Sequence, residues 1–409
     1  MSEHAPMPAG RRGQTLVLVG IIALAFNLRP AAVSVGPVLA DIRADLGMSS
    51  TQAGILTTLP VLAFALFGAL APRIAHVVGL HRTSFLALLS MVLGLAARSR
   101  VSQVWLFLAL TVLSLAGAAT ANVLMPSLVK LHFPDRIGPL SSIYTTALSV
   151  GLFLSASLTV PISDALGSWR WGLASWAVVA ALAAVPWVAL VARDQSLATG
   201  RRTVSLGQVA RTPLGWWMAM CFGLQSLQAY AVFGWFAQVY RDAGFSPTTA
   251  GLLLGTVTGV SIPVSFWVPT YAAKLRNQTW LFMALLAADA IGYAGLVVAP
   301  HAGAWVWAAL VGAGTGVFPL VLTLIGLRSR TEGGTAALSG FTQSVGYLVS
   351  AVGPFGMGYL YGRTGGWSVP LLSLLALLGP LALTCVFVSR TSFVEDQIAK
   401  RSRALAHRQ

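Results

Sequence analysis

A single arginine inside an apolar stretch is the residue of this sequence best suited to chemistry. Arg29 lies within the run from Ala23 to Pro37, and almost everything between Arg12 and Asp41 is hydrophobic. An arginine at the centre of a membrane-spanning helix costs roughly 2.5 to 3.5 kcal/mol on insertion scales, so something must compensate it. Its guanidinium has five donors in a fixed fork, which suits carboxylate, nitro, nitrate-like or cyanate-like groups. The alternative is that Arg29 snorkels or bonds local carbonyls.

The residues around Arg29 predict a local opening of its helix. Pro30 lacks a backbone donor and clashes with the carbonyl four residues back, so we expect the helix to open around residues 25–26. Freed backbone at membrane depth is tolerated where it lines a cavity. Asn27 stands in the same short motif and is a second candidate for contact with a substrate.

Other polar residues in apolar stretches are candidates for the same site. Gln225 and Gln228 are three apart and share a helix face, as do Gln343 and Tyr347, which are four apart. Intramembrane polar residues line a cavity or join helices, and we favour cavity lining for the glutamines. The remaining candidates for substrate contact are Asn122, Tyr144 and the aromatic Phe341, whose type is also common in packing and at membrane interfaces.

Asp289 is the acid expected deepest in the membrane. A carboxyl group there can bind and release a proton, or can pair with a neighbouring polar residue. If no acid couples transport of a solute, the remaining mechanisms are facilitated diffusion and a proton carried by the substrate. His76, His81 and His132 are expected at helix ends, in contact with water.

The composition defines the elements that must position these residues. Of 409 residues, 56% are hydrophobic and 9% charged, and mean hydropathy is +0.77. A soluble domain has about 25% charged residues, so the chain is predicted to be an integral membrane protein. The net charge of +15 is assigned to cytoplasmic loops, because no basic run with interleaved aromatics suggests a nucleic-acid partner. Cys221 and Cys385 lie in apolar stretches, and no cofactor or metal site is predicted.

Twelve apolar segments are long enough to span a bilayer. They predict an all-α membrane protein with these parts: a cytoplasmic tail at 1–13, a six-helix bundle at 14–192, a polar linker at 193–210, a second six-helix bundle at 211–389 and a cytoplasmic tail at 390–409. With both termini inside, Lys and Arg are in clear excess on the cytoplasmic side, as the positive-inside rule requires. In this assignment Arg98 is one of the few outside loop charges.

An internal repeat relates the two halves. The segment 47–54 aligns with 244–251, and the same spacing carries Pro72 onto Pro269. Gly151 in the first half likewise has a counterpart in Gly346. Ser226 takes the place of Arg29 in the second half, so the predicted site has one charged wall and one neutral polar wall.

Two motifs then resemble a known family. The segment holding Gly68, Pro72, Arg73, Gly79 and Arg82 is similar to the cytoplasmic gating loop of the major facilitator superfamily, with Pro72 where an acid usually stands. The residues 27–30 and 34–37, with 122–130, resemble the cyanate permease and 2-nitroimidazole transporter branch. The resemblance implies two pseudo-symmetric six-helix bundles, alternating access, and a ninth span at the periphery.

The expected function is secondary active or facilitative transport of a small anionic or polar planar solute. The expected setting is the inner membrane. The chain is expected to be a monomer, with the solute, the lipid bilayer and, where transport is coupled to them, protons as its partners. A proton-coupled multidrug exporter is the alternative within transport, although Arg29 would repel a cationic drug. A membrane receptor or sensor is the alternative from another class. An enzyme is not expected, because no nucleophile elbow, phosphate loop or metal cluster is present.

Overall fold

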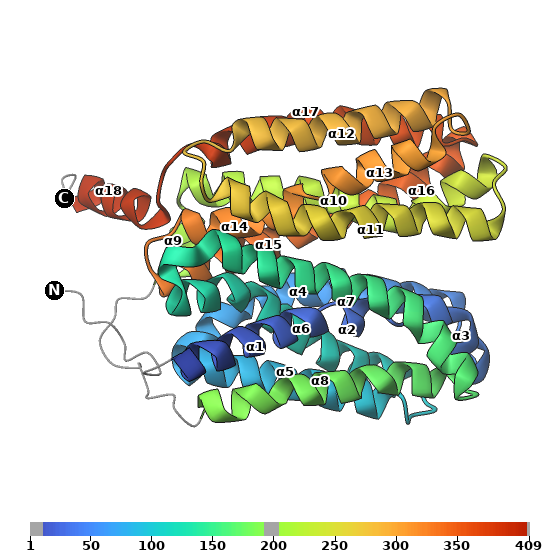
Figure 1. Ribbon diagram of the computed structural model, residues 1–409, viewed down its shortest axis with the longest axis horizontal. Coiled ribbons are helices and arrows are strands. Elements are labelled where there is room, and N and C mark those ends of the chain that lie inside the picture. The colour runs from blue at the N-terminus through green and yellow to red at the C-terminus, as the bar shows by residue number, and fades with distance from the viewer. Residues whose placement is uncertain (1–10, 192–203, 407–409) are drawn as a thin grey trace. The chain divides into compact units, whose positions relative to one another are not determined.

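The computed structural model describes residues 11–191 and 204–406, and every regular element within these ranges is helical (Figure 1). Parts of the predicted tails and linker, at 1–10, 192–203 and 407–409, lie outside the described residues. The chain forms two compact units. One holds the described residues up to Val191 together with Thr331–Ala336, and the other holds Val204–Arg330 and the described residues from Ala337 onward. Each unit is described by itself.

The first unit is built from eight α-helices and two short 3₁₀ turns. These are α1 (Arg11–Asn27), α2 (Pro30–Val33), η1 (Gly36–Val38), α3 (Leu39–Leu46), α4 (Ser50–Val78), α5 (Leu80–Arg98), α6 (Val104–His132), η2 (Pro134–Arg136), α7 (Ile137–Ala165) and α8 (Trp169–Val191). α6 packs against α4 and α5, while α1 packs against α6, α7 and α8. The predicted first span is therefore divided into α1, α2, η1 and α3.

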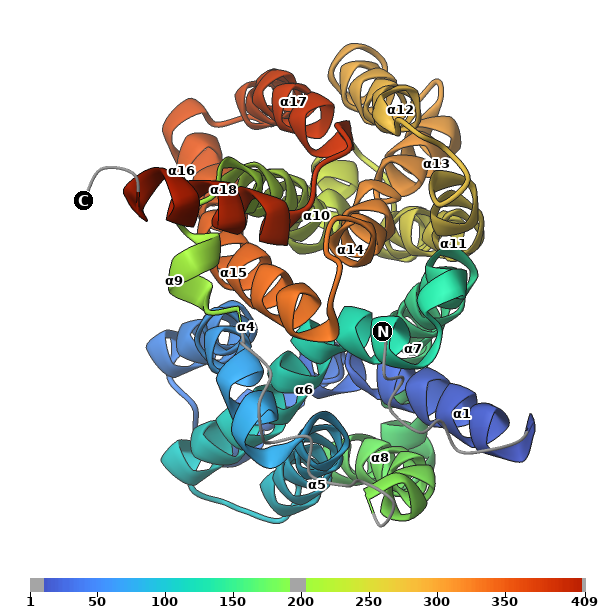
Figure 2. The ribbon, with the colours of Figure 1, turned by 90° about the vertical axis from the view of Figure 1, so that its left-hand side faces the viewer.

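The second unit is also built mainly from long helices. It contains α9 (Leu206–Val209), α10 (Pro213–Asp242), α11 (Pro247–Ala272), α12 (Thr279–Val298), α13 (Ala304–Gly314), α14 (Val317–Leu327), most of α15 (Glu332–Ser350), α16 (Val352–Thr364), α17 (Ser368–Ser389) and α18 (Val394–Ala406). Within this unit α10 packs against α11, α14, α16 and α17 (Figure 2). Because four helices surround α10, two of its glutamines are buried.

Ten stretches of the described residues are long and apolar enough to cross a membrane, and the chain is a multi-pass membrane protein. The other two spans in the predicted set of twelve correspond to α10 and to α15 with α16. Both are helical but carry more polar side chains, among them Gln225, Gln228 and Gln343. Helices that face protein on most sides need less hydropathy than helices that face lipid.

The internal repeat is visible in how two helices begin. α4 starts after Ser49, whose side chain accepts a hydrogen bond from the Gln52 amide, and α11 starts after Ser246, which caps Thr249 in the same way. Such caps satisfy amides that have no partner within the helix. The preceding glycines Gly47 and Gly244 both have positive φ, a conformation that glycine adopts without strain.

Candidate functional site

The first membrane span is interrupted at Leu28 and Arg29. α1 ends at Asn27, and the next helical turn begins with Pro30. The Leu28 amide donates three residues back to Ala25, and the amides of Ala32 and Val33 both donate to the Arg29 carbonyl. The predicted opening is therefore present, slightly C-terminal to the expected 25–26. A proline favours the first position of a new helical turn, which places the interruption just before it.

Arg29 is half-buried within this interruption, and Asn27 beside it is almost fully buried. The Asn27 amide nitrogen donates to the Ala23 carbonyl over 2.8 Å. Its side-chain oxygen has no hydrogen-bond partner among the described residues. The opening thus combines a guanidinium with a buried acceptor that is free to receive a hydrogen bond.

Arg98 is a second arginine at the interruption. It is the last residue of α5, and its side chain is 0% exposed, although it is counted among the loop charges of the predicted topology. One guanidinium nitrogen donates to the Ala31 carbonyl over 3.2 Å, and another donates to Ser34 Oγ over 3.0 Å. The Ser34 hydroxyl donates in turn to the Pro30 carbonyl over 2.6 Å. Arg98 therefore holds the short helix α2 from the end of α5.

The sequence carries little signal for this burial. Arg98 and Arg100 are two residues apart at the end of one span and look alike as loop charges. The structure separates them because α5 ends at Arg98, while Arg100 lies in the turn that follows. Arg100 is exposed, as expected for both.

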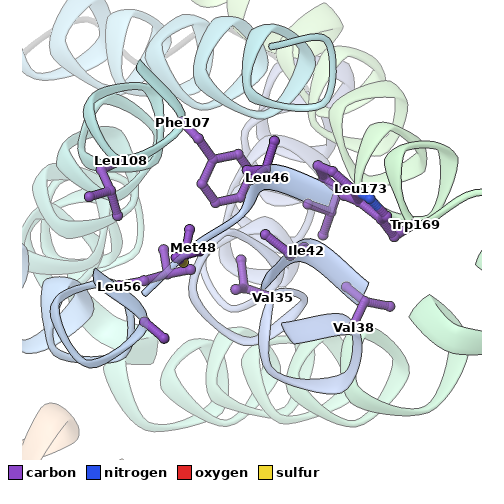
Figure 3. Packing of buried hydrophobic residues seen from close by; sticks show 11 residues of the cluster. Val35, Val38, Ile42, Leu46, Met48, Leu56, Phe107, Leu108, Trp169 and Leu173 are labelled. Atoms are coloured by element: carbon purple, nitrogen blue, oxygen red, sulfur yellow. The ribbon is translucent and has the colours of Figure 1, made fainter. Parts of the chain in front are cut away.

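The segment after the interruption is anchored by a hydrophobic cluster (Figure 3). Side chains of α3 and the preceding turn pack with residues of α4, α6 and α8; the labelled members are Val35, Val38, Ile42, Leu46, Met48, Leu56, Phe107, Leu108, Trp169 and Leu173. Asp45 on α3 also forms an ion pair with Arg170 on α8, at 2.8 Å. These contacts therefore fix the segment that follows the interruption on its C-terminal side.

On the other side, α7 lies very close to α1. A Cβ atom added to Gly151 would collide with the Phe26 carbonyl, which Pro30 leaves without its helical donor. The second unit has the equivalent approach, where Gly346 packs against Phe222 and Gly223. The predicted pairing of these glycines in the repeat is thus matched by their packing.

Asn122 and Tyr144 are on helices that contact the interrupted span. Asn122 on α6 is 2% exposed and Tyr144 on α7 is fully buried, and both helices pack against α1 and α2. The Tyr144 hydroxyl has no hydrogen-bond partner among the described residues. Four of the predicted site residues therefore belong to the interrupted helix or to its two neighbours.

In the second unit, three predicted residues line one cavity. Gln225 and Gln228 of α10 reach it from one side and Asp289 of α12 from another, together with Tyr293, Thr315 and several apolar residues. The cavity volume is about 10 Å³, which is close to the space one water molecule needs. The resemblance implies a ninth span at the periphery, which would keep Asp289 apart from the glutamines. Within this unit it shares their cavity.

The remaining predicted residues on α15 are buried against other side chains. Phe341 makes an edge-to-face contact with Trp216 at 5.3 Å between ring centres, and Tyr347 does so with Phe222 at 5.1 Å. Gln343 donates to Ser339 Oγ over 2.8 Å.

The predicted cytoplasmic loop is mostly helix. Gly68, Pro72 and Arg73 lie in the last turns of α4, and Arg82 lies in the first turn of α5. Gly79 forms the connection with φ of 101°, a value open to glycine. The histidines nearby also differ from expectation, because His132 is 9% exposed and its Nε2 lies 2.7 Å from that of His81.

Comparison with known proteins places the chain among transporters. The family model described as the Major Facilitator Superfamily matches residues 16–354. The uncharacterized transporter YycB of Bacillus subtilis (strain 168) is 37% identical over 91% of this chain and 93% of its own length. The 2-nitroimidazole transporter of Escherichia coli (strain K12) is 34% identical over 90% and 93%. The cyanate transport protein CynX of the same strain is 27% identical over 86% and 91%.

Solved structures agree at the level of the fold. The proton:xylose symporter XylE superposes with a TM-score of 0.73 at 15% sequence identity, covering 95% of this chain and 98% of that one. At this identity the likeness speaks for the helical architecture and not for the substrate.

Proposed function

Since the chain belongs to the major facilitator superfamily and is a transporter, not an enzyme, we propose that it carries a small planar solute with negative charge or a strongly polar edge. The solute class is cyanate-like, nitrate-like, nitroimidazole-like or carboxylate-like. Transport proceeds by alternating access, in which the two units expose the bound solute first to one side of the membrane and then to the other. The membrane is the inner membrane, with both termini in the cytoplasm.

The observation that carries this proposal is the interruption of the first span at Arg29. A continuous helix satisfies its own backbone and presents only side chains, whereas the open turn adds a guanidinium and a buried Asn27 acceptor at one place. Irregular backbone at membrane depth is found where it is buried or lines a cavity. The guanidinium suits a solute that accepts hydrogen bonds on one planar edge, and the Asn27 oxygen can accept a hydrogen bond from a donor elsewhere on the solute.

The chemistry of Arg29 favours this class over a cationic drug. A permanent cation attracts a carboxylate, nitro or cyanate group and repels an amine, with little screening in a low-dielectric site. Two relatives that cover most of this chain are named for 2-nitroimidazole and cyanate, which are small, planar or linear and polar. Their names support the size and polarity of the proposed solute.

The test is uptake by proteoliposomes that contain the purified chain. 2-Nitroimidazole, cyanate and benzoate serve as probes, and Arg29→Ala and Arg29→Lys are compared with the wild type. A charge-assisted hydrogen bond contributes about 1.5 to 3 kcal/mol, so Arg29→Ala should lower kcat/KM by roughly tenfold or more for every accepted probe. Arg29→Lys should recover part of this loss, because it keeps the charge and loses the planar fork.

Arg100→Ala is the matched control, since it removes an exposed arginine from the end of α5. It should transport like the wild type. Normal uptake of every accepted probe by Arg29→Ala would show that the anion site is elsewhere.

A further inference from the structure

Asp289 is a buried carboxyl group that binding of an anion at Arg29 does not use. It is 5% exposed, and its carboxylate makes no hydrogen bond or ion pair with the described residues. It borders the cavity that Gln225 and Gln228 also line. Burying an ionised carboxylate without a partner costs free energy. We therefore expect this carboxyl group to bind a ligand that neutralises its charge.

The surrounding helices make a bare carboxylate still less favourable. A Cβ atom at Gly314 would collide with the Asp289 carboxyl, which therefore abuts the last residue of α13. The C-terminal end of a helix carries partial negative charge and favours cations. α13 and α14 contain no titratable side chain, and α17 contains only Cys385. Tyr293 is the other titratable residue of the cavity lining.

The cavity also offers an acceptor that needs a donor. Gln228 is 4% exposed, its nitrogen donates to the Leu374 carbonyl over 2.9 Å, and its oxygen has no partner among the described residues. The side-chain nitrogen of the neighbouring Gln225 donates a hydrogen bond to Ser226 Oγ over 2.7 Å. A protonated carboxyl, or one water molecule bound to it, supplies the missing donor.

We propose that Asp289 and this cavity form a proton-binding site, in which the proton occupies a carboxylate oxygen and is hydrogen-bonded directly or through one water to Gln228. The lining favours a proton over a metal cation. Hard cations such as Ca²⁺ take about six to eight oxygen ligands. Here the lining is largely apolar, with residues such as Val232, Val311 and Leu381, and the space is that of one water.

The site adjoins a helix that is already interrupted, so a change in the charge of Asp289 can affect that interruption. α13 ends at Gly314 and α14 begins at Val317, because Pro319 provides no amide for the turn between them. The Gly316 amide donates three residues back to Ala313, so the turn is tightened at this point. Ionisation of Asp289 places negative charge against this turn, and protonation removes it. This inference rests on the proposed function: the proton gradient then drives accumulation of the solute.

The test compares Asp289→Asn with the wild type in proteoliposomes, with 2-nitroimidazole and cyanate as probes. Asparagine keeps the shape and a donor for Gln228 but cannot release a proton. We expect accumulation driven by a pH gradient to fall to the equilibrium level, while exchange of labelled for unlabelled probe without a gradient stays within about twofold of the wild type. Asp135→Asn, which alters an exposed carboxylate, should retain both activities.

A second measurement needs no transported solute. Infrared spectroscopy of the wild type should show a protonated carboxyl band that is absent from Asp289→Asn, so this arm decides on the proton site even if no probe is carried. Gradient-driven accumulation by Asp289→Asn, or an unchanged carboxyl band, would overturn the proposal. Accumulation that follows a sodium gradient and ignores pH would replace the proton with Na⁺. Absence of any probe transport by the wild type would instead count against the proposed function.

Discussion

Replacing Arg98 by methionine tests how the interruption of the first span is held. The Arg98 guanidinium makes two hydrogen bonds, to Ala31 and Ser34, and each is worth about 1.5 to 3 kcal/mol because the donor is charged. Against this gain stand the cost of burying the charge, several kcal/mol, and about 1 to 3 kcal/mol for the Nε donor, which has no partner among the described residues. The balance is close to zero, so Arg98→Met should unfold within a few degrees of the wild type.

Lysine at the same position should be worse than methionine. Arg98→Lys keeps a buried charge but replaces the planar fork by one compact ammonium, which cannot reach both acceptors in the same geometry. The loss of one bond, about 1.5 to 3 kcal/mol, corresponds to a melting temperature lower by about 3 to 12 °C.

Thermal unfolding in detergent by intrinsic fluorescence measures the order of stability, and uptake of 2-nitroimidazole measures function. Both variants should raise KM, because α2 is no longer held beside Arg29. A methionine variant that melts well below the lysine variant would refute the reasoning, since it would mean that the charge itself stabilises the fold.

Three further changes test separate parts of the structure. Gly151→Ala forces a Cβ against a backbone carbonyl of α1 and should cost about 1 to 3 kcal/mol in thermal unfolding, whereas Gly54→Ala, where the new atom meets open space, should not destabilise. Ser246→Ala removes a helix cap and should cost about 1 kcal/mol with uptake unchanged. The hydrogen bond from Arg330 lowers the pKa of Asp396, so its contribution to docking of α18 is present above the ordinary Asp pKa and is lost as pH falls through the lowered value. Hydrogen exchange in α18 should therefore rise in acid, and Arg330→Gln should remove this pH dependence.

The features that the sequence predicts well are those set by neighbours along the chain. Pro30 lacks the amide that would bond the carbonyl four residues back, and Ser49 and Ser246 cap helices through amides three residues away. The apolar lengths that predict membrane spans are local in the same sense. These effects need no knowledge of the fold, so the helical architecture and the opening at Arg29 followed from the sequence.

The features that the sequence predicts poorly depend on which helices meet. Arg98 is buried because the end of α5 reaches the Ala31 carbonyl of α2 and the Ser34 hydroxyl, more than sixty residues away. Asp289 joins the glutamines of α10 because the helices of the second unit bring α10 and α12 to one cavity. The edge-to-face contact of Phe341 with Trp216 likewise joins residues far apart in the sequence. Such pairings are tertiary, and apolar periodicity does not specify them.

Each unit contains a helix that is interrupted at a proline and has an ionisable side chain beside the gap. The two side chains carry opposite charges when they are ionised. At α2 the ionisable group is Arg98, a cation that donates to the Ala31 carbonyl and the Ser34 hydroxyl, so this segment is held by a permanent charge. At the end of α13 the group is Asp289, whose negative charge would oppose the carbonyl end of the helix. The first gap is therefore stable at any physiological pH, because arginine does not release its proton. The second is compensated only when a proton is added. On this reasoning the first unit supplies a fixed binding surface for the solute, and the step that responds to a proton gradient belongs to the second.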